Sequence, residues 1–271
     1  MQLGLNGQVA LVTGGGQGVG RQICLELAAE GARVVVNDLF EERAQAVADE
    51  ITAAGGQSLA APANITRLDE VEAMVARASA HFSAPVTILV NNAGIIPERR
   101  EKGGRTPPFL ETPVADWSKI VDLNVYGTMY CCRAVLPGMV EKKTGRIINI
   151  ISEAGRIGEA NMAVYSGAKA AIGGFAKALA REHGRHAITV NSVALGAVSH
   201  EGIKDGPLNI NATVENNELL KKMLNVYPIS KGVGRLSRPS DISGVVAFLA
   251  SEQALFVTGQ TLGASGGFVM N

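Results

Sequence analysis

The stretch Thr13-Gly14-Gly15-Gly16-Gln17-Gly18-Val19-Gly20 decides how the rest of the sequence is interpreted. It follows the apolar run Val9-Ala10-Leu11-Val12 and opens a helical pattern from Gly18 to Ala29, which Gly31 ends. Its glycines fit the spacing G-x-x-x-G-x-G through Gly14, Gly18 and Gly20. Bare backbone at the start of a helix lets an anion approach the unpaired N–H groups there. The stretch therefore predicts a strand, a turn and a helix that bind a pyrophosphate.

The same alternation of strand and helix continues along the chain. Apolar runs without internal alternation are typical of strands buried on both faces, and strand–helix alternation is typical of a doubly wound sheet. We predict one α/β domain over residues 1–271, with a Rossmann-type parallel sheet of about seven strands and helices on both faces. The expected strands are residues 9–12, 33–37, 57–61, 87–90, 146–151, 188–193 and 260–262, and the clearest helices are residues 18–29, 41–54 and 68–82.

Composition excludes several classes of protein. The 25 basic and 25 acidic residues cancel, which argues against a nucleic-acid partner and gives no reason to expect an anionic membrane surface. We find no signal peptide and no apolar run long enough to span a bilayer, and expect a soluble cytoplasmic protein. The 3 cysteines form no C-x-x-C pair, so neither a disulfide framework nor a metal site is predicted. The expected partner is a small molecule.

Asp38 ends the second predicted strand, 18 residues after Gly20. A carboxylate at this position can accept hydrogen bonds from the ribose hydroxyls of adenosine, and it would repel a 2′-phosphate. No Arg or Lys lies at positions 14–19 or 37–40 to bind that phosphate. The sequence therefore predicts NAD rather than NADP.

Tyr165 and Lys169 are four residues apart at the start of a predicted helix, and so lie on one face about one turn apart. A phenol with a pKa near about 10 is a poor base at neutral pH, but a nearby ammonium favours the phenolate. Ser152, at the end of the fifth predicted strand, can bring its hydroxyl to the same edge of the sheet. A helix-surface pair alone would explain Tyr165 and Lys169, but not their combination with Ser152 and Asp38.

With these motifs, the chain resembles the short-chain dehydrogenase/reductase family over essentially its whole length. The resemblance also rests on Asn91-Asn92-Ala93-Gly94, on Asn124 in Leu123-Asn124-Val125, and on the ending from Thr258 to Gly267. It implies an NAD-dependent enzyme that interconverts a secondary alcohol and a ketone by hydride transfer, and a homotetramer.

The resemblance also implies a role for each matching residue. Tyr165 would be the general acid/base, Lys169 would bind the nicotinamide ribose and lower the pKa of Tyr165, Ser152 would bond the developing oxyanion, and Asn124 would hold a water that links Lys169 to solvent. The residues expected at the cofactor are Gly14, Gln17, Gly18, Val19, Gly20, Asp38, Leu39, Asn64, Ile65, Asn91, Ala93, Gly94, Tyr165, Lys169, Gly196 and Val198.

Three positions depart from the family pattern. Asn64 stands where an Asp usually contacts the adenine amino group, and its amide oxygen can still accept that bond. Leu195-Gly196 replaces the usual Pro-Gly, which loosens the turn that carries the nicotinamide contacts. A Thr is expected four residues after Gly196, but His200 stands there with Ser199 beside it, and either could substitute.

Two long connections, about residues 95–112 and 199–236, should form the substrate pocket. The first carries Arg99, Arg100, Lys102 and Arg105 against Glu98 and Glu101, so it is either a solvated loop or a site for an anionic substrate. The second resembles a short helical lid over an apolar pocket, built from Ile203, Leu208, Ile210, Leu219, Leu220, Met223 and Leu224. This favours a lipophilic or alicyclic alcohol, such as a steroid or a cyclohexanol. The alternatives are a 3-hydroxyacyl-CoA-type dehydrogenase or ketoacyl reductase, and a catalytically idle NAD-binding subunit.

Overall fold

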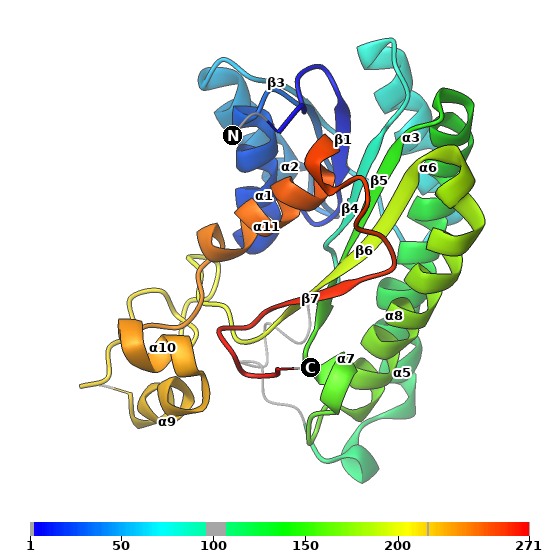
Figure 1. Ribbon diagram of the computed structural model, residues 1–271. Helices are drawn as coiled ribbons and strands as arrows, with labels where there is room; N and C mark the ends of the chain where they lie inside the picture. Colours follow the sequence, from blue (N-terminus) through cyan, green and yellow to red (C-terminus); the bar gives the residue numbers. More distant parts are fainter. Residues whose placement is uncertain (1–2, 96–106, 216, 271) are drawn as a thin grey trace.

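The seven predicted strands form one sheet in the computed structural model, which describes residues 3–95, 107–215 and 217–270 (Figure 1). Its order is β3-β2-β1-β4-β5-β6-β7, and every neighbouring pair is parallel. The doubly wound parallel sheet is therefore confirmed. The strands are β1 (Val9–Val12), β2 (Arg33–Val36), β3 (Gln57–Ala60), β4 (Ile88–Asn91), β5 (Gly145–Ser152), β6 (Ile188–Leu195) and β7 (Thr261–Ala264).

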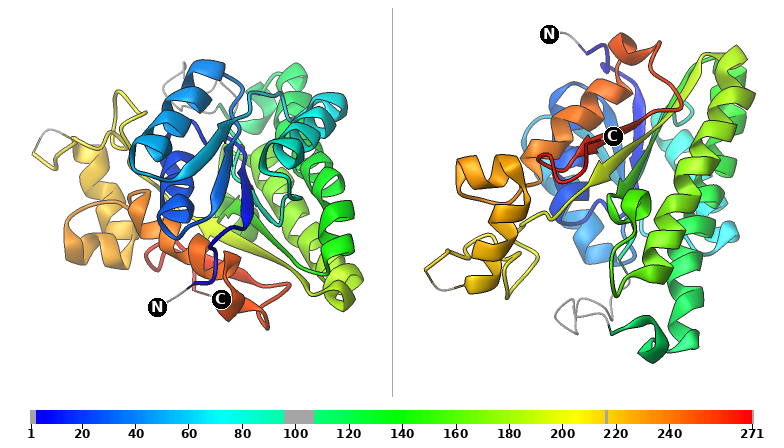
Figure 2. Two further views of the ribbon diagram at one scale, coloured as in Figure 1. Left: turned by 90° about the horizontal axis from the view of Figure 1, so that it is seen from above. Right: turned by 60° about the horizontal axis from the view of Figure 1, so that its bottom comes forward.

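Helices cover both faces of this sheet (Figure 2). One face carries α1 (Gly18–Ala29), α2 (Glu41–Ala53) and α11 (Ser240–Ala250), and the other carries α3 (Leu68–Phe82), α6 (Gly127–Lys142) and α8 (Ala163–His183). The remaining helical elements are η1 (Phe109–Glu111), α5 (Val114–Val121), η2 (Asp122–Tyr126), α7 (Ala154–Ile157), η3 (Gly184–His186), α9 (Glu218–Val226), α10 (Pro228–Val233) and η4 (Glu252–Ala254).

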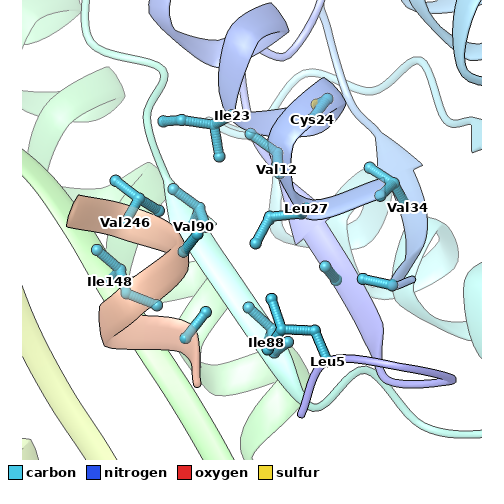
Figure 3. Close-up of a cluster of buried hydrophobic side chains, with 14 of the residues drawn as sticks. Leu5, Val12, Ile23, Cys24, Leu27, Val34, Ile88, Val90, Ile148 and Val246 are labelled. Carbon is cyan, nitrogen blue, oxygen red and sulfur yellow. The ribbon is translucent and has the colours of Figure 1, made fainter. Parts of the chain in front are cut away.

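The apolar runs in the sequence become the centre of two cores, one on each face. Figure 3 shows the first, where Leu27 of α1, Val90 of β4, Ile148 of β5 and Val246 of α11 meet. Because successive side chains of a strand point to opposite faces, Leu11 and Ile147 belong to the second core instead. Each fully buried side chain of this size stabilises the fold by roughly 1.5–3 kcal/mol. The cores therefore fix the register of the strands.

The strand order reverses between β1 and β4, where the chain first crosses from one half of the sheet to the other. In open α/β sheets such a reversal opens a crevice at the carboxyl ends of the strands. The glycine turn follows β1 at this edge, Ala93 and Gly94 follow β4, and Ser152 ends β5. The fold thus gathers the predicted site residues from distant parts of the chain.

The connection after β6 contains the short helices α9 and α10, in the segment where the sequence predicts a helical lid. The Asn217 side chain accepts a hydrogen bond from Leu220 N–H at 2.9 Å and so starts α9. Leu220 and Leu224 pack with Tyr227 and Leu236, so these apolar residues build a small core inside the lid itself. The predicted basic loop, with Arg99, Arg100, Lys102 and Arg105, lies outside the described residues.

The three cysteines, Cys24, Cys131 and Cys132, are buried with free thiols, and Cys131 and Cys132 lie within α6. Burial raises the pKa of the Cys132 thiol to about 12. Within the described residues, no helix combines the length and the apolar character needed to cross a membrane.

Candidate active site

The glycine turn is shaped by close backbone contacts. Gly14 and Gly18 have φ of 60° and 54°, in the left-handed region that favours glycine. A Cβ on Gly20 would lie 2.1 Å from the Gly14 carbonyl oxygen, so only glycine fits there. The first turn of α1 consequently packs directly on the end of β1 and leaves open backbone where an anion can bind. Gln17 stands immediately before α1, and Val19 lies in its first turn.

Two polar residues that were not predicted as site residues tie this turn to the end of β4. Asn92 Nδ2 donates to the carbonyl oxygens of Thr13 and Gly14, each at 3.0 Å. The Thr13 hydroxyl accepts from Asn92 N–H at 3.0 Å and from Ala93 N–H at 3.1 Å. Thr13 directly precedes the glycines and Asn92 lies within the Asn-Asn-Ala-Gly motif, and these positions are the sequence features that could have identified both as site residues. The bonds hold Ala93 against the glycine turn.

Asp38 is fixed beside the same turn, at the end of β2. It is 6% exposed, and its two carboxylate oxygens accept hydrogen bonds from Gly16 N–H and Phe40 N–H, each at 3.2 Å. Arg43 lies close by, since a Cβ on Gly16 would be 2.6 Å from its Cβ, and its guanidinium stands over the Phe40 ring at 4.3 Å. Arg43 is thus a cation near Asp38 that lies outside positions 14–19 and 37–40 of the sequence.

The segment after β6 passes over the glycine turn. A Cβ on Gly18 would lie 3.0 Å from the His200 ring. Gly202 N–H donates to His200 Nδ1 at 3.1 Å, so in a neutral ring the proton is on Nε2, which becomes a donor. Ser199 is buried, and its N–H donates to the Ser237 carbonyl at 2.8 Å. Of the two candidates at the usual Thr position, His200 is the one beside the glycine turn.

Lys169 is buried one helical turn beyond Tyr165 in α8, as the spacing predicts. Its Nζ donates to the Ile150 carbonyl at 2.9 Å and lies 5.7 Å from the centroid of the Tyr165 ring. Burial lowers the pKa of Lys169 from 10.5 to about 8. At neutral pH the group is therefore a desolvated ammonium close to the phenol.

Asn124 is brought to the same place by an irregular helix. It lies in the π-helical turn η2, and its Nδ2 donates to the Ile120 carbonyl at 2.9 Å. A Cβ on Gly94 would lie 2.7 Å from Lys169 Nζ and 2.8 Å from Asn124 Oδ1. Asn124 Oδ1 is buried and has no hydrogen-bond partner among the described residues. An acceptor of this kind fits the water that the family resemblance implies.

Ser152 lies at the end of β5, where its hydroxyl accepts from Ala154 N–H at 3.2 Å. The short helix α7 follows at once, and a Cβ on Gly155 would lie 2.8 Å from the Lys169 Cβ. The missing side chain of Gly155 thus sets how closely the Ser152 segment approaches α8. A phenol, an ammonium and a hydroxyl at one edge of the sheet can together bond a substrate oxygen and exchange a proton with it.

Four other residues predicted at the cofactor differ from one another in burial and in hydrogen bonding. Asn91 is buried, and its Nδ2 donates to Asn149 Oδ1 at 2.9 Å, so its side chain links strand β4 to strand β5. Asn64 Oδ1 accepts from Thr66 N–H at 3.0 Å and from the Thr66 hydroxyl at 2.8 Å, in an Asx turn. The oxygen expected to meet adenine is thus already bonded. Leu39 is exposed and Ile65 is buried.

The glycine turn yields a test with a matched control. We expect Gly20→Ala to lower the melting temperature, because the new methyl group would overlap the Gly14 carbonyl. Gly244→Ala, in α11, adds its methyl where nothing lies within 4 Å and should raise stability by about 0.5–1 kcal/mol. Thermal unfolding of both variants checks this, and equal stability of Gly20→Ala and the wild type would contradict the close packing.

The burial of Lys169 predicts a gain of stability when the charge is removed. The pKa falls from 10.5 to about 8, which corresponds to about 3 kcal/mol of unfavourable free energy for the ammonium form. Lys169→Met should therefore unfold at a higher denaturant concentration at pH 7, with a gain of about 1–3 kcal/mol after loss of the bond to Ile150.

The sign of the pH dependence follows from the same pKa. The gain should be complete below about pH 8, shrink as the pH rises towards 10.5, and vanish above it, where Lys169 is neutral in both the folded and the unfolded wild type. Denaturant unfolding across this range measures it. A gain that grows with pH would rule out a desolvated ammonium.

The chain is similar to known proteins over most of its length. The family model for short chain dehydrogenases matches residues 8–205. A 3-oxoacyl-[acyl-carrier-protein] reductase of Synechocystis is 38% identical, and the (2S)-[(R)-hydroxy(phenyl)methyl]succinyl-CoA dehydrogenase subunit BbsD of Thauera aromatica is 39% identical, with 98% of each chain covered in both cases.

A solved structure shares the fold of this chain. A 7α-hydroxysteroid dehydrogenase in complex with NADH and 7-oxo glycochenodeoxycholic acid superposes with a TM-score of 0.86 at 35% identity, covering 100% of this chain and 97% of the other. From the family match, the identity to these relatives and the shared fold, the chain belongs to the short-chain dehydrogenase/reductase family of oxidoreductases.

Proposed function

We propose that the protein interconverts a secondary alcohol and a ketone with NAD as the hydride acceptor or donor. The observation that carries this proposal is the grouping of Tyr165, the buried Lys169 ammonium and Asn124 Oδ1, which has no partner in the described part of the chain. Ser152 lies at the end of the adjoining strand. A bound nicotinamide supplies the hydride chemistry. The protein contributes orientation, charge and the path of the proton.

Each of these side chains has a defined task in the proposal. The phenol of Tyr165 exchanges a proton with the substrate oxygen, and Ser152 donates a hydrogen bond to that oxygen as negative charge develops on it. The Lys169 ammonium favours the phenolate of Tyr165 and binds the nicotinamide ribose. Asn124 Oδ1 holds a water beside Lys169, which gives the proton a route to solvent.

The described residues fit a dinucleotide. The glycines leave bare backbone at the start of α1, because a Cβ at Gly20 or at Gly16 would overlap neighbouring atoms. Asp38 supports NAD over NADP, since its carboxylate is fixed by two backbone N–H groups and would repel a 2′-phosphate. Because the His200 ring lies beside Gly18, we propose that its Nε2–H takes over the usual role of the Thr hydroxyl towards the cofactor.

For the substrate, two classes have support from relatives. The names of the Synechocystis and Thauera aromatica relatives both specify acyl thioesters, which favours a 3-hydroxyacyl thioester here. The hydroxysteroid dehydrogenase favours the alicyclic alcohol that the apolar lid predicts. From the sequence alone, the thioester is the alternative to the alicyclic alcohol. The relatives support the thioester at least as well as the alcohol, and we therefore propose a thioester as the first candidate substrate.

The family resemblance also implies a homotetramer, which stays a prediction. Phe256 and Met270 are 98% and 77% exposed in the C-terminal part of the chain, where such an interface would cover them.

The choice of cofactor can be tested at Asp38. We expect Asp38→Ala to lower kcat/KM for NAD by about 10- to 100-fold, because hydrogen bonds to a charged group are lost, and to raise kcat/KM for NADP as the repulsion disappears. Asp49→Ala, which removes an exposed carboxylate on α2, is the control and should change neither value. An unchanged ratio of the two cofactors in Asp38→Ala would remove the basis for NAD.

The reaction can be tested with a panel of 3-hydroxyacyl-CoA, hydroxysteroid and cyclohexanol substrates, followed by NADH absorbance. Tyr165→Phe should lower kcat on every accepted substrate by about 10²- to 10⁴-fold, the range for loss of a general acid or base. Tyr130→Phe is the matched control. Wild-type turnover that survives in Tyr165→Phe contradicts the catalytic assignment, and NADH binding without any turnover indicates an idle subunit.

A further inference from the structure

Tyr227 stands at the junction of the two lid helices. It is the single residue between the end of α9 and the start of α10, and it is 9% exposed. Its ring packs with Leu220, Leu224 and Leu236 of the lid core, and lies 4.8 Å from the ring of Phe268 in the C-terminal segment. Any movement of the lid helices relative to the sheet therefore involves this ring.

The same side chain contacts the turn that follows β6. Ala197 N–H donates to Tyr227 Oη at 3.1 Å. A Cβ on Gly196 would lie 2.6 Å from Tyr227 Cε1, so the ring rests directly on the backbone of Gly196. Ring and hydroxyl thus hold two successive residues of one turn.

This turn leads from β6 to the residues expected at the nicotinamide. Before Gly196 it is anchored by Glu153 N–H, which donates to the Leu195 carbonyl at 3.0 Å. After Ala197 it is anchored by the bridge between Val198 and Ser237. Leu195, at the first of these anchors, offers no rigid ring of the kind that a Pro would supply. Tyr227 supplies the support in the middle of the turn.

We propose that Tyr227 is a positioning residue, which holds Gly196 and Ala197 in the conformation that binds the nicotinamide and thereby couples the lid to cofactor affinity. The proposal rests on the proposed function as a nicotinamide-dependent enzyme. Burial raises the pKa of Tyr227, and so do the charges of Glu159 and Glu153, so its hydroxyl stays protonated and uncharged at neutral pH.

The test is Tyr227→Phe, which keeps the ring on Gly196 and removes only the acceptor for Ala197 N–H. We expect the Kd for NADH, from fluorescence titration, to rise by about 5- to 50-fold, because the loss leaves a partly buried donor without its partner. Hydrogen exchange at the Ala197 amide should accelerate. KM for the cofactor should rise more than kcat falls, and the pH profile of kcat should keep its shape because Tyr165 and Lys169 are unchanged.

Two further variants sharpen the result. Tyr130→Phe, which removes a phenol hydroxyl from α6, should leave the Kd for NADH and the Ala197 exchange rate as in the wild type. Tyr227→Leu, which also removes the ring from Gly196, should weaken NADH binding further than Tyr227→Phe does.

The outcomes separate this proposal from the proposed function. If the wild type binds NADH while Tyr227→Phe binds it within twofold and exchanges Ala197 N–H at the wild-type rate, Tyr227 has no positioning role and the proposed function stands. If the wild type binds neither NADH nor NADPH, both proposals are wrong.

Discussion

The burial of one ammonium group constrains the whole candidate site. Lys169 Nζ is bonded to the Ile150 carbonyl, and two glycines leave room for the lysine side chain. Gly94 has no Cβ to meet Nζ, and Gly155 has none to meet the Lys169 backbone. Strand β5, the end of β4 and helix α7 are therefore packed around an ammonium group whose pKa is lowered by its burial. A pKa shift of this kind is typical of a group retained for chemistry.

Much of this arrangement could be predicted from the sequence, because local patterns specify it. The bounds of α1 and α3 agree with the prediction, since glycine turns and helical periodicity mark them. The glycine turn, Asp38 and the Tyr165–Lys169 pair stand in recognisable spacings. The bounds of β1 also agree, whereas β2 and β3 end one residue earlier than predicted. The two central strands β5 and β6 extend one or two residues beyond the apolar runs, because they are hydrogen-bonded to each other over eight residues.

Other features depend on contacts between distant segments, which spacing does not reveal. The Asn91 amide turns to Asn149, 58 residues later, and the His200 ring reaches back to Gly18. Tyr227 is one tyrosine among apolar lid residues, and only the fold brings its hydroxyl to Ala197. The π-helical turn that presents Asn124 likewise has no local sequence signal that we used. These contacts depend on how the fold brings distant segments together, and the spacing of residues in the sequence does not specify them.

The buried cysteines have a consequence for studying the lid. Cys24, Cys131 and Cys132 all lie in the core, and burial raises the pKa of each thiol, so the folded chain carries almost no thiolate at neutral pH. A cysteine introduced at an exposed lid position such as Leu219, which is 56% exposed, would then be the single reactive thiol of the folded protein. A spectroscopic label placed there could follow the opening and closing of the lid with the native cysteines left in place.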